Sequence, residues 1–354
     1  MATDLVVLGA GIVGASVVAE ARRRLPGLSI VLLDDGRRVS ASALSAGLVT
    51  PFCGEGLRRR RSLQAFAHYQ ALGLGWAGVS QLPFSYVHDP AQAPRPLLFE
   101  ARSVASPLAE VLGRYRGQRT LGTLLQAGHA LAVDVPGLVR ACLALGATGP
   151  GRFERVEARV ERVSREAAGW RLQAAGGTLQ ARHLIVAAGA RGNALDGVVQ
   201  GGSIKKIVAF DLQGPRPPDT AEGVIYLPGR KAFVMRNRQG DGWLLSITSE
   251  DWRNDAEGDL SVHSHETRQA RRILDEELPG LDIHTLRPRA AFDSYCSDFE
   301  PQVVRLPQGP GACALVGASG SGVRFAPALA CEALAAVGLI DSDSPSSPVN
   351  SREA

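Results

Sequence analysis

The stretch that decides the fold is LVVLGAGIVGAS at residues 5–16. It begins with an apolar run, Leu5–Leu8, which is typical of a buried strand. A glycine-rich turn follows, and Ala15–Arg24 then alternates small and apolar residues at helical spacing. A second apolar run, Leu28–Leu33, comes next. This order of strand, turn, helix and strand predicts two parallel strands joined by a right-handed crossover.

Three glycines in the turn have the G-x-G-x-x-G spacing of dinucleotide-binding sites. Gly9 permits the tight turn, Gly11 lets the backbone approach a pyrophosphate, and Gly14 lets the helix pack closely on the strand. An acidic side chain at the end of the second strand can bind a ribose. Asp34 is the preferred candidate because it directly follows the apolar run, and Asp35 is the alternative. The predicted pyrophosphate site comprises Gly9, Ala10, Gly11, Ile12, Val13 and Gly14.

The composition indicates an ordinary folded protein. The chain has 354 residues, of which 45% are hydrophobic, so it can bury a sizeable core in one or two domains. A formal net charge of +4 does not indicate nucleic-acid binding. The five cysteines form no C-x-x-C pair, which favours a reducing compartment over a zinc site. With no leader and no apolar run of about 18 residues, we expect a cytoplasmic protein without a membrane span or a metal.

Patterns further along the chain predict additional strands and one further helix. Two apolar runs that end in small residues, His183–Ala188 and Ala312–Val316, predict buried strands. The stretch 205–248 contains short β-rich pieces separated by proline and glycine turns, which predicts a separate antiparallel sheet. Helical spacing returns at Ser264–Leu278. The tail, Asp341–Ala354, has few large apolar residues, and we expect it to be mobile.

Four motifs of the chain resemble those of the D-amino acid oxidase family, which includes glycine oxidase and sarcosine oxidase. They occur in the family's order along nearly the whole chain. The motifs are VVLGAGIVGAS at 6–16, SALSAGL at 42–48, LIVAAGA at 184–190 and GASGSGVRFAP at 317–327. The resemblance implies an FAD-dependent oxidoreductase rather than an enzyme that binds NAD alone.

The resemblance also implies where the chain contacts FAD. In this family the second motif lies beside the pyrophosphate and the flavin, the third lies near the adenosine, and the last precedes a helix at the flavin ring. Val160, in the strand-like segment 158–160, would meet the adenine through its backbone. The contacts implied beyond the N-terminal turn are Ser42, Ser45, Ala46, Gly47, Val160, Ala188, Gly189, Gly317, Ser319, Gly320, Ser321, Gly322, Val323 and Arg324.

The last motif supports a flavin site on physical grounds as well. Gly317, Gly320 and Gly322 form a loop with few side chains, which a flat ring can approach. The apolar helix predicted from Ala326 to Val337 directs its N-terminus at that ring, and the helix dipole favours the anionic reduced flavin. The alternative is a strand-to-helix turn that needs glycine for its backbone conformation alone.

The chain departs from the family where a substrate carboxylate would bind. The resemblance places an arginine just upstream of an Asp-x-x-Pro element, and Asp293 stands there in this chain. Arg287 and Arg289 would serve only with a shift in register. Arg324 matches a carboxylate-binding lysine of sarcosine oxidases and is our preferred anion anchor, because a guanidinium binds a carboxylate through two bonds. Asp293 would favour a cationic group or pair with Arg324.

Two further family features are missing. The cysteine that tethers flavin in sarcosine oxidases aligns with Ala291, and Cys296 comes five residues later, so we predict non-covalent FAD. Their oxygen-activating lysine lies on a strand that resembles 242–248, which has no lysine here. Lys205 and Lys206 are alternatives on another strand, where we expect surface residues. The electron acceptor is therefore O2 or an unknown partner.

The predicted fold is α/β, or α+β overall. A Rossmann-like FAD-binding domain of discontinuous segments adjoins a substrate domain with a mixed, mostly antiparallel sheet. The FAD-binding domain is assigned to 1–75, 130–200 and 290–340. The substrate domain is assigned to 76–129 and 201–289, and a disordered tail to 341–354.

The predicted reaction oxidises the C–N bond of an amino acid or secondary amine to an imine, by hydride transfer to flavin N5. Arg324 and Tyr226 are the candidate catalytic residues, and Tyr226 would close over the substrate. A NAD-dependent reductase and a non-catalytic flavoprotein subunit of a larger complex are the alternatives, and the sequence is compatible with a homo-oligomer. Arg58–Arg61 is expected to be a solvated helix face, and His263 and His265 to be surface residues.

Overall fold

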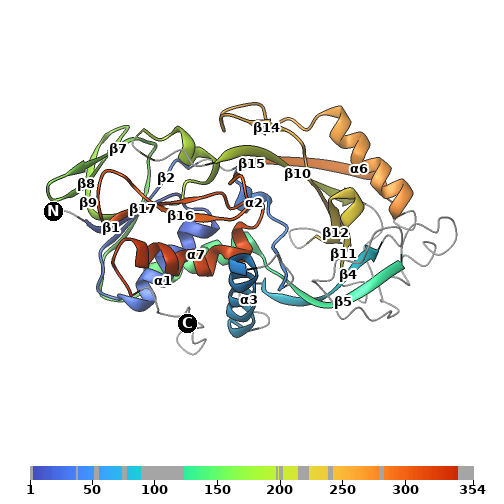
Figure 1. The fold of residues 1–354 in the computed structure, drawn as a ribbon, viewed down its shortest axis with the longest axis horizontal. Coiled ribbons are helices and arrows are strands. Elements are labelled where there is room, and N and C mark those ends of the chain that lie inside the picture. Colours follow the sequence, from blue (N-terminus) through green and yellow to red (C-terminus); the bar gives the residue numbers. More distant parts are fainter. Residues whose placement is uncertain are drawn as a thin grey trace.

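The computed structural model describes most of the chain and contains two β-sheets that lie side by side (Figure 1). None of the helices in the described ranges is long and apolar enough to cross a membrane. The tail predicted to be mobile lies outside the described residues except for Asp341. The described ranges are 3–36, 39–51, 56–73, 78–88, 123–196, 198, 202–213, 223–237, 242–278 and 283–341.

The first sheet is the predicted Rossmann-like sheet. Its order is β16-β17-β9-β1-β2-β6, and all neighbours from β17 to β6 are parallel, whereas β16 is antiparallel to β17. The hairpin β7-β8 is attached to β9. The strands are β1 (Thr3–Leu8), β2 (Ile30–Asp34), β6 (Phe153–Glu157), β7 (Val160–Glu166), β8 (Gly169–Ala174), β9 (Gly177–Val186), β16 (Gln302–Arg305) and β17 (Ala312–Val316).

Alternating apolar residues of β1 form the core on both faces of this sheet. Leu5 and Val7 pack against helices α1 and α7, whereas Val6 and Leu8 face a cluster that contains Trp170 of β8. Both faces are therefore covered, as the continuous apolar run of β1 predicts. The helices beside this sheet are α1 (Ile12–Arg24), α5 (Val135–Gly146) and α7 (Gly322–Ala336).

The second sheet confirms the prediction of a mixed, mostly antiparallel layer. Its order is β14-β10-β13-β12-β11-β4-β5-β3, with β15 paired to β10, and only the β11–β4 pair is parallel among the described pairs. Its strands are β3 (Leu48–Val49), β4 (Ser80–His88), β5 (Thr123–Ala132), β10 (Ser203–Gln213), β11 (Val224–Leu227), β12 (Ala232–Arg236), β13 (Trp243–Ile247), β14 (Trp252–Arg253) and β15 (Thr285–Tyr295).

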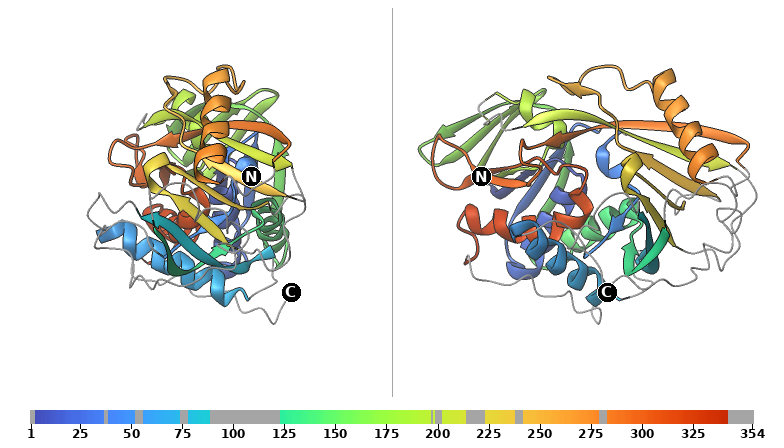
Figure 2. Two further views of the ribbon diagram at one scale, coloured as in Figure 1. Left: turned by 90° about the vertical axis from the view of Figure 1, so that its right-hand side faces the viewer. Right: turned by 45° about the vertical axis from the view of Figure 1, so that its right-hand side comes forward.

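Helix α6 (Ser264–Glu277) covers one face of the second sheet (Figure 2). Its buried residues Ala270, Ile273 and Leu274 pack on Val208 and Phe210 of β10. The opposite face of β10 carries Ala209, which belongs to a different apolar cluster. One face of β10 therefore packs on α6. The other face packs in a cluster that also contains Leu44, from the segment after β2 of the first sheet.

Strand β15 links the two sheets. It pairs with β10 from Ser203–Tyr295 to Gln213–Thr285 and then leads through residues 296–301 into β16 of the first sheet. The domain boundary assigned at residue 290 falls within this strand, and the domain limits stay a prediction. The consequence is that the end of β15 lies beside the loop that precedes α7.

The expectation that Arg58–Arg61 is a solvated face is wrong for one residue. Helix α3 (Gly56–Ala71) exposes Arg59 and Arg60, but the Arg61 side chain is only 4% exposed. Arg61 forms an ion pair of 2.5 Å with Glu332 of α7 and donates to the Pro301 carbonyl at 2.6 Å. Packing of α3 on α7 buries this one position of the run.

Candidate flavin and substrate site

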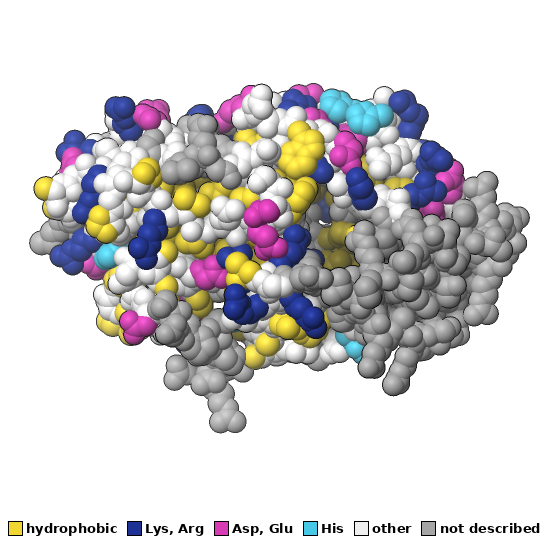
Figure 3. Space-filling model, viewed as in Figure 1, with side chains coloured by type: hydrophobic (Ala, Val, Ile, Leu, Met, Phe, Trp, Pro, Cys, Tyr) yellow, Lys and Arg dark blue, Asp and Glu magenta, His cyan; other side chains and the backbone are white. Residues whose placement is uncertain are grey.

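A continuous cavity of about 820 Å³ runs from the N-terminal glycine turn to the inner face of the second sheet. This volume is in the upper part of the range of roughly 300–1,000 Å³ for small-molecule sites. Figure 3 shows a hollow near the middle of one face of the molecule, between apolar and basic side chains. Predicted site residues that line the cavity are Gly9, Gly11, Ile12, Val13, Asp34, Asp35, Ser42, Ser45, Ala46, Val160, Ala188, Gly189, Tyr226, Ser319, Gly320, Ser321, Gly322, Val323 and Arg324.

The remaining predicted contacts, Ala10, Gly14, Gly47 and Gly317, do not line the cavity. The glycines among them allow close packing of the surrounding backbone. A Cβ atom on Gly14 would meet the Gly9 carbonyl, one on Gly47 would meet the Val133 carbonyl, and one on Gly317 would meet the Cys296 side chain. These three glycines therefore contribute to the packing around the cavity and not to its lining.

The N-terminal turn has the geometry that its spacing predicts. Gly9 has a φ of 106°, and a Cβ there would lie 2.5 Å from the Ala187 carbonyl oxygen. Gly11 lines the cavity, and a Cβ on it would lie 3.1 Å from Ser42 Oγ. The Ile12 N–H donates to the same Ser42 Oγ at 2.9 Å. The Ser42 hydroxyl thus joins the second motif, residues 42–48, to the start of α1 through a hydrogen bond.

The two acidic residues after β2 have different partners. Asp34 Oδ2 accepts a hydrogen bond of 2.7 Å from Ala10 N–H, and Asp34 Oδ1 accepts one of 3.0 Å from Gly36 N–H. Asp35 Oδ2 lies 3.6 Å from Arg191 Nη1. Asp34 therefore holds the glycine turn in place while it lines the cavity, and its predicted contact with a ribose stays a prediction.

The loop that precedes α7 is held by the end of β15. Ser294 Oγ accepts from Gly317 N–H at 3.0 Å, and the Ser294 carbonyl accepts from Ser319 N–H at 2.8 Å. Asp293 Oδ2 accepts from Gly320 N–H at 2.6 Å. Ser319 has a φ of 52°, a backbone conformation that L-residues rarely adopt, so these bonds offset local strain.

Asp293 is a buried carboxyl group on the cavity wall. Burial raises its pKa to about 6, although the hydrogen bonds from the Gly320 and Ser294 N–H groups act in the opposite direction. The expected alternative of a pair with Arg324 is not observed, and within the described ranges Asp293 has no basic side chain within 4 Å. Its role in the loop was not apparent from the sequence.

Two arginines lie at the cavity beside the start of α7. Arg324 Nη1 lies 3.5 Å from Ser321 Oγ, and the guanidinium carbons of Arg324 and Arg58 are each 5.9 Å from the centre of the Phe325 ring. Both arginines line the cavity. Arg287 and Arg289 do not, and Arg289 forms an ion pair of 2.9 Å with Asp211. The position of Arg324 is compatible with the predicted anion anchor.

The expectation that Lys205 and Lys206 are surface residues is wrong, because both are buried. Lys205 Nζ lies 4.7 Å from the centre of the Trp252 ring and 5.6 Å from that of Tyr295, and burial lowers its pKa. Lys206 is fully buried beneath α6. The burial of the two lysines arises from β15, β14 and α6, none of which lies near them in the sequence.

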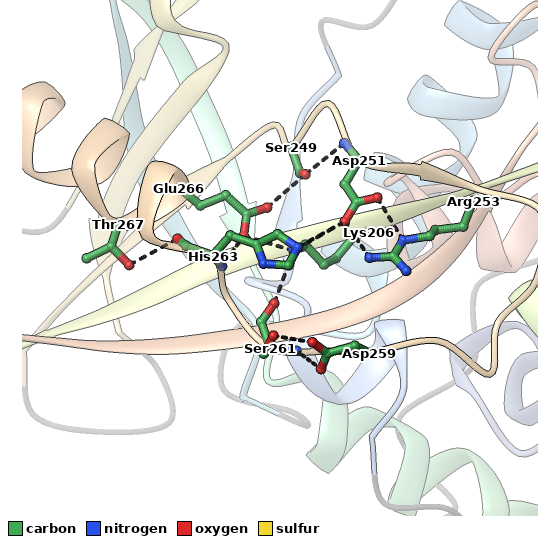
Figure 4. Close-up of polar contacts among 9 residues, drawn as sticks. All are labelled: Lys206, Ser249, Asp251, Arg253, Asp259, Ser261, His263, Glu266 and Thr267. Carbon is green, nitrogen blue, oxygen red and sulfur yellow. Dashed lines mark hydrogen bonds and ion pairs between the residues drawn. The ribbon is translucent and has the colours of Figure 1, made fainter.

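Lys206 lies at the centre of a polar cluster (Figure 4). Its Nζ is 2.9 Å from Glu266 Oε2 and 3.4 Å from Asp251 Oδ2, and it donates to the Ser261 carbonyl at 3.1 Å. The Arg253 hydrogen bonds are the main cause that lowers the pKa of Asp251 to about 2. Glu266 also accepts from Ser249 Oγ and from the backbone of His263 at the start of α6. The cluster fixes residues 249–266 to β10.

Parts of residues 249–266 also reach the cavity, which the sequence did not indicate. Ala256, Glu257 and Leu260 line it. Glu257 Oε1 lies 3.7 Å from Nη2 of Arg159, which lies between β6 and β7 of the first sheet. His263 is partly exposed, and its ring stacks on that of His265 at 5.6 Å. Within the described ranges, no group of three or more His, Cys, Asp or Glu side chains is arranged to hold a metal ion.

Comparison with known proteins identifies the family. The family described as FAD dependent oxidoreductase (DAO) matches residues 4–336. The chain belongs to this family. This confirms the resemblance based on the four motifs, and the cofactor of the FAD-dependent oxidoreductase family is FAD.

The fold is shared with solved enzymes of this FAD-dependent family. Iminodiacetate oxidase from Chelativorans sp. has a TM-score of 0.78 at 19% identity, over 96% of this chain and 97% of that one. Glycine oxidase from Geobacillus kaustophilus has a TM-score of 0.76 at 16% identity, over 95% of this chain and 94% of that one. These similarities establish the fold class that the sequence predicts.

A curated relative of this FAD-dependent oxidoreductase is the tRNA 5-methylaminomethyl-2-thiouridine biosynthesis bifunctional protein MnmC of a Caulobacter species. It is 30% identical over 346 residues, which are 92% of this chain and 53% of that protein. The chain thus spans about half the length of the curated relatives that it matches.

The backbone around the cavity fits FAD. Helix α1 begins after Gly11 and α7 begins after Ser321, and neither N-cap residue has a side chain that accepts a hydrogen bond from a backbone N–H in the first turn of its helix. Both N-termini border the same cavity, so two sets of backbone donors and two positive dipole ends meet there. The start of α1 suits a pyrophosphate, which is anionic, and the start of α7 suits a flavin ring, which becomes anionic when it is reduced.

Proposed function

We propose that this FAD-dependent oxidoreductase oxidises the C–N bond of an amino acid or secondary amine to an imine. The observation that carries the proposal is the continuity of the cavity, which joins the two helix N-termini to the inner face of the second sheet. FAD accepts a hydride when it is bound. The protein's own residues would hold the substrate with its C–H bond toward the flavin and keep water away from it.

Two side chains support an amino acid as the substrate. Arg324 lies at the end of the cavity beside α7, where it could bind a carboxylate. Tyr226 of β11, in the second sheet, lines the same cavity, with its ring 6.4 Å from that of Phe84 in a stacked arrangement. A substrate between them would be bound at its anionic end by Arg324 and covered on its apolar part by Tyr226.

The names of similar proteins favour an amine that bears a short acidic substituent. Iminodiacetate and glycine, for which two of the solved oxidases are named, both carry a CH2 group between nitrogen and a carboxylate. We therefore favour an N-substituted glycine or a related small amino acid over a plain alkylamine. Its oxidised carbon would be the one that bears the nitrogen.

A second candidate substrate is an amine carried on a tRNA uridine. It is favoured by the 30% identity to the Caulobacter MnmC protein over 92% of this chain. The two candidates share the same chemistry at the C–N bond and differ in what lies beyond the cavity. The two candidates are distinguished by testing small amines and modified tRNA as substrates in parallel.

The test of the proposed function is anaerobic reduction of the bound flavin. The protein with FAD is mixed with glycine, sarcosine, iminodiacetate, D-amino acids, cyclic amines, plain alkylamines and bulk tRNA, and loss of the oxidised flavin absorbance is followed. Reduction by at least one amine supports the proposal, and the set of compounds that reduce the flavin identifies the substrate class. If no amine or tRNA reduces the flavin, the chain is better described as a non-catalytic flavoprotein subunit.

A further inference from the structure

Asp293 is a buried carboxyl group whose surroundings leave its charge uncompensated. It is 5% exposed and lines the cavity, and within the described ranges no Lys, Arg or His nitrogen lies within 4 Å of it. A buried charge without a partner is strongly unfavourable in a folded protein. The group must therefore be neutral in the empty cavity or have its cationic partner in a ligand.

The two hydrogen bonds that Asp293 accepts keep it in place for such a ligand. Oδ1 accepts from Ser294 N–H at 2.9 Å and Oδ2 accepts from Gly320 N–H at 2.6 Å. Each carboxylate oxygen can accept a second hydrogen bond. These backbone donors also favour the ionised form, so the group can exchange a proton without losing its position.

Within the described ranges, the charged and titratable side chains around Asp293 form no ion pair with it. Lys205 stands directly opposite on β10, but its ammonium is directed at the rings of Trp252 and Tyr295. Tyr295 lies two residues further along β15, and burial together with the Asp293 charge raises the pKa of its hydroxyl. At the start of α7, Arg324 contacts Ser321 and the Phe325 ring instead.

We propose that Asp293 is the subsite that binds the ammonium group of the substrate and accepts its proton before oxidation. The inference rests on the proposed amine oxidation. In this step an N–H bond of the ammonium breaks, an O–H bond forms on the carboxylate, and the electron pair stays on nitrogen. A charged pair becomes a neutral amine and a neutral acid, which suits a buried cavity. No electrons are transferred in this step, and Asp293 loses its proton to water after the product leaves, which restores the carboxylate for the next substrate.

The subsite also defines the substrate class. At neutral pH a simple amine is protonated, because its pKa is near that of lysine, about 10.4. An amino acid or N-substituted glycine arrives as a zwitterion, with its ammonium for Asp293 and its carboxylate for Arg324. Both residues adjoin the same loop, Asp293 through Gly320 and Arg324 through Ser321. The pair would accept a zwitterion and reject an uncharged amide or ether.

The decisive experiment compares pH profiles of anaerobic flavin reduction. Wild type should reach its plateau well below the pKa of the amine. Asp293→Asn can use only amine that is already neutral in solution, so at pH 7.4 it should be slower by about 1,000-fold for an amine with a pKa of about 10.4. Its rate should approach that of wild type above that pKa. Asp293→Glu should retain the wild-type profile.

Ser294→Ala is the matched structural control. It removes the acceptor of the Gly317 N–H bond in the same loop and leaves the carboxylate in place. We expect it to alter FAD affinity or overall rate with an unchanged pH profile. If Asp293→Asn has the profile of wild type, or if its deficit persists unchanged at high pH as in Ser294→Ala, Asp293 has a structural role only and the proposal is overturned.

A binding measurement separates this inference from the proposed function. tert-Butylamine is a cation at neutral pH and has no C–H bond on the carbon that bears nitrogen, so it cannot be oxidised. Its binding is followed through the absorbance of the oxidised flavin. The subsite predicts binding to wild type at pH 7, weakened at least tenfold in Asp293→Asn and not in Ser294→Ala. Equal binding to wild type and Asp293→Asn contradicts the subsite, whatever the enzyme oxidises.

Discussion

The Asp293 carboxylate accepts a hydrogen bond of 2.6 Å from the Gly320 N–H and thereby joins the second sheet to the loop at the start of α7. This bond connects the proposed substrate side of the cavity to the proposed flavin side. It also buries an acidic group for which the described part of the chain provides no cation.

This burial predicts a pH-dependent stability in the protein without FAD. The folded-state pKa of Asp293 is about 6, above its ordinary value of 3.8. For an acid whose pKa is raised by folding, the folded state holds the proton more tightly, so stability falls as pH rises. The free energy of unfolding should decrease by on the order of 3 kcal/mol between about pH 4 and pH 6 because of this group.

Other carboxylates, such as Asp251, have lowered pKa values and act in the opposite direction. The measured quantity is therefore the difference in unfolding free energy between wild type and Asp293→Asn, from urea titrations at several pH values. We expect this difference to change in favour of Asn as the pH rises from 4 to 6. A difference that is constant over this range would show that the carboxyl is not buried in solution.

The glycine turn predicts a loss of FAD affinity in Gly11→Val. The added side chain would crowd Ser42 Oγ and enter the cavity at the start of α1. Gly27→Ala is the control, since a Cβ there meets nothing within 4 Å. Flavin absorbance per protein after gel filtration should fall to near zero in Gly11→Val and stay unchanged in Gly27→Ala. A fully yellow Gly11→Val would exclude the pyrophosphate from this turn.

We predict that acid precipitation releases all flavin into the supernatant. None of the four described cysteines lines the cavity. Cys296 is buried with its Sγ 3.7 Å from the Val316 carbonyl oxygen, and Ala291 occupies the position that matches the tethering cysteine. Flavin absorbance in the precipitated protein would contradict this, and its loss in Cys296→Ala would identify the link.

Arg324→Ala should weaken the binding of amino acid substrates. Truncation of one side of a desolvated ion pair costs on the order of 2–5 kcal/mol, which is about 30-fold to several thousand-fold in affinity. The measurement is the substrate concentration dependence of anaerobic flavin reduction. Arg59→Ala is the control, because Arg59 is exposed and does not line the cavity. Unchanged affinity in Arg324→Ala would show that the carboxylate binds elsewhere, with Arg58 as the next candidate.

The buried pair of Lys206 and Glu266 predicts a large loss of stability when one partner is removed. Lys206→Met leaves Glu266 buried without its cation and should cost on the order of 3–5 kcal/mol. Lys231→Met breaks an exposed pair with Glu250 and should cost no more than about 1 kcal/mol. Urea unfolding of both variants tests the contrast. Equal, small losses would mean that water reaches the Lys206 cluster.

The sequence by itself determined four strands of the first sheet (β1, β2, β9 and β17), four strands of the second (β10, β11, β12 and β13) and the backbone of the glycine turn. These features follow from local rules: apolar runs predict strands, and G-x-G-x-x-G requires backbone conformations that few residues other than glycine adopt. The same rules placed Asp34 at the end of β2. Its hydrogen bond to Ala10 lies within the same local unit of strand, turn and helix.

Only the tertiary structure decided the roles of Asp293, Lys205 and Lys206. Each depends on partners that are distant in the chain: Asp293 on a loop 27 residues away, Lys205 on the rings of Trp252 and Tyr295, and Lys206 on Glu266 of α6. Burial and the charge of a neighbour set the state of an ionisable group, and neither can be read from the residues adjacent in sequence. The same aspartate and lysines on an exposed strand would be ordinary solvated charges.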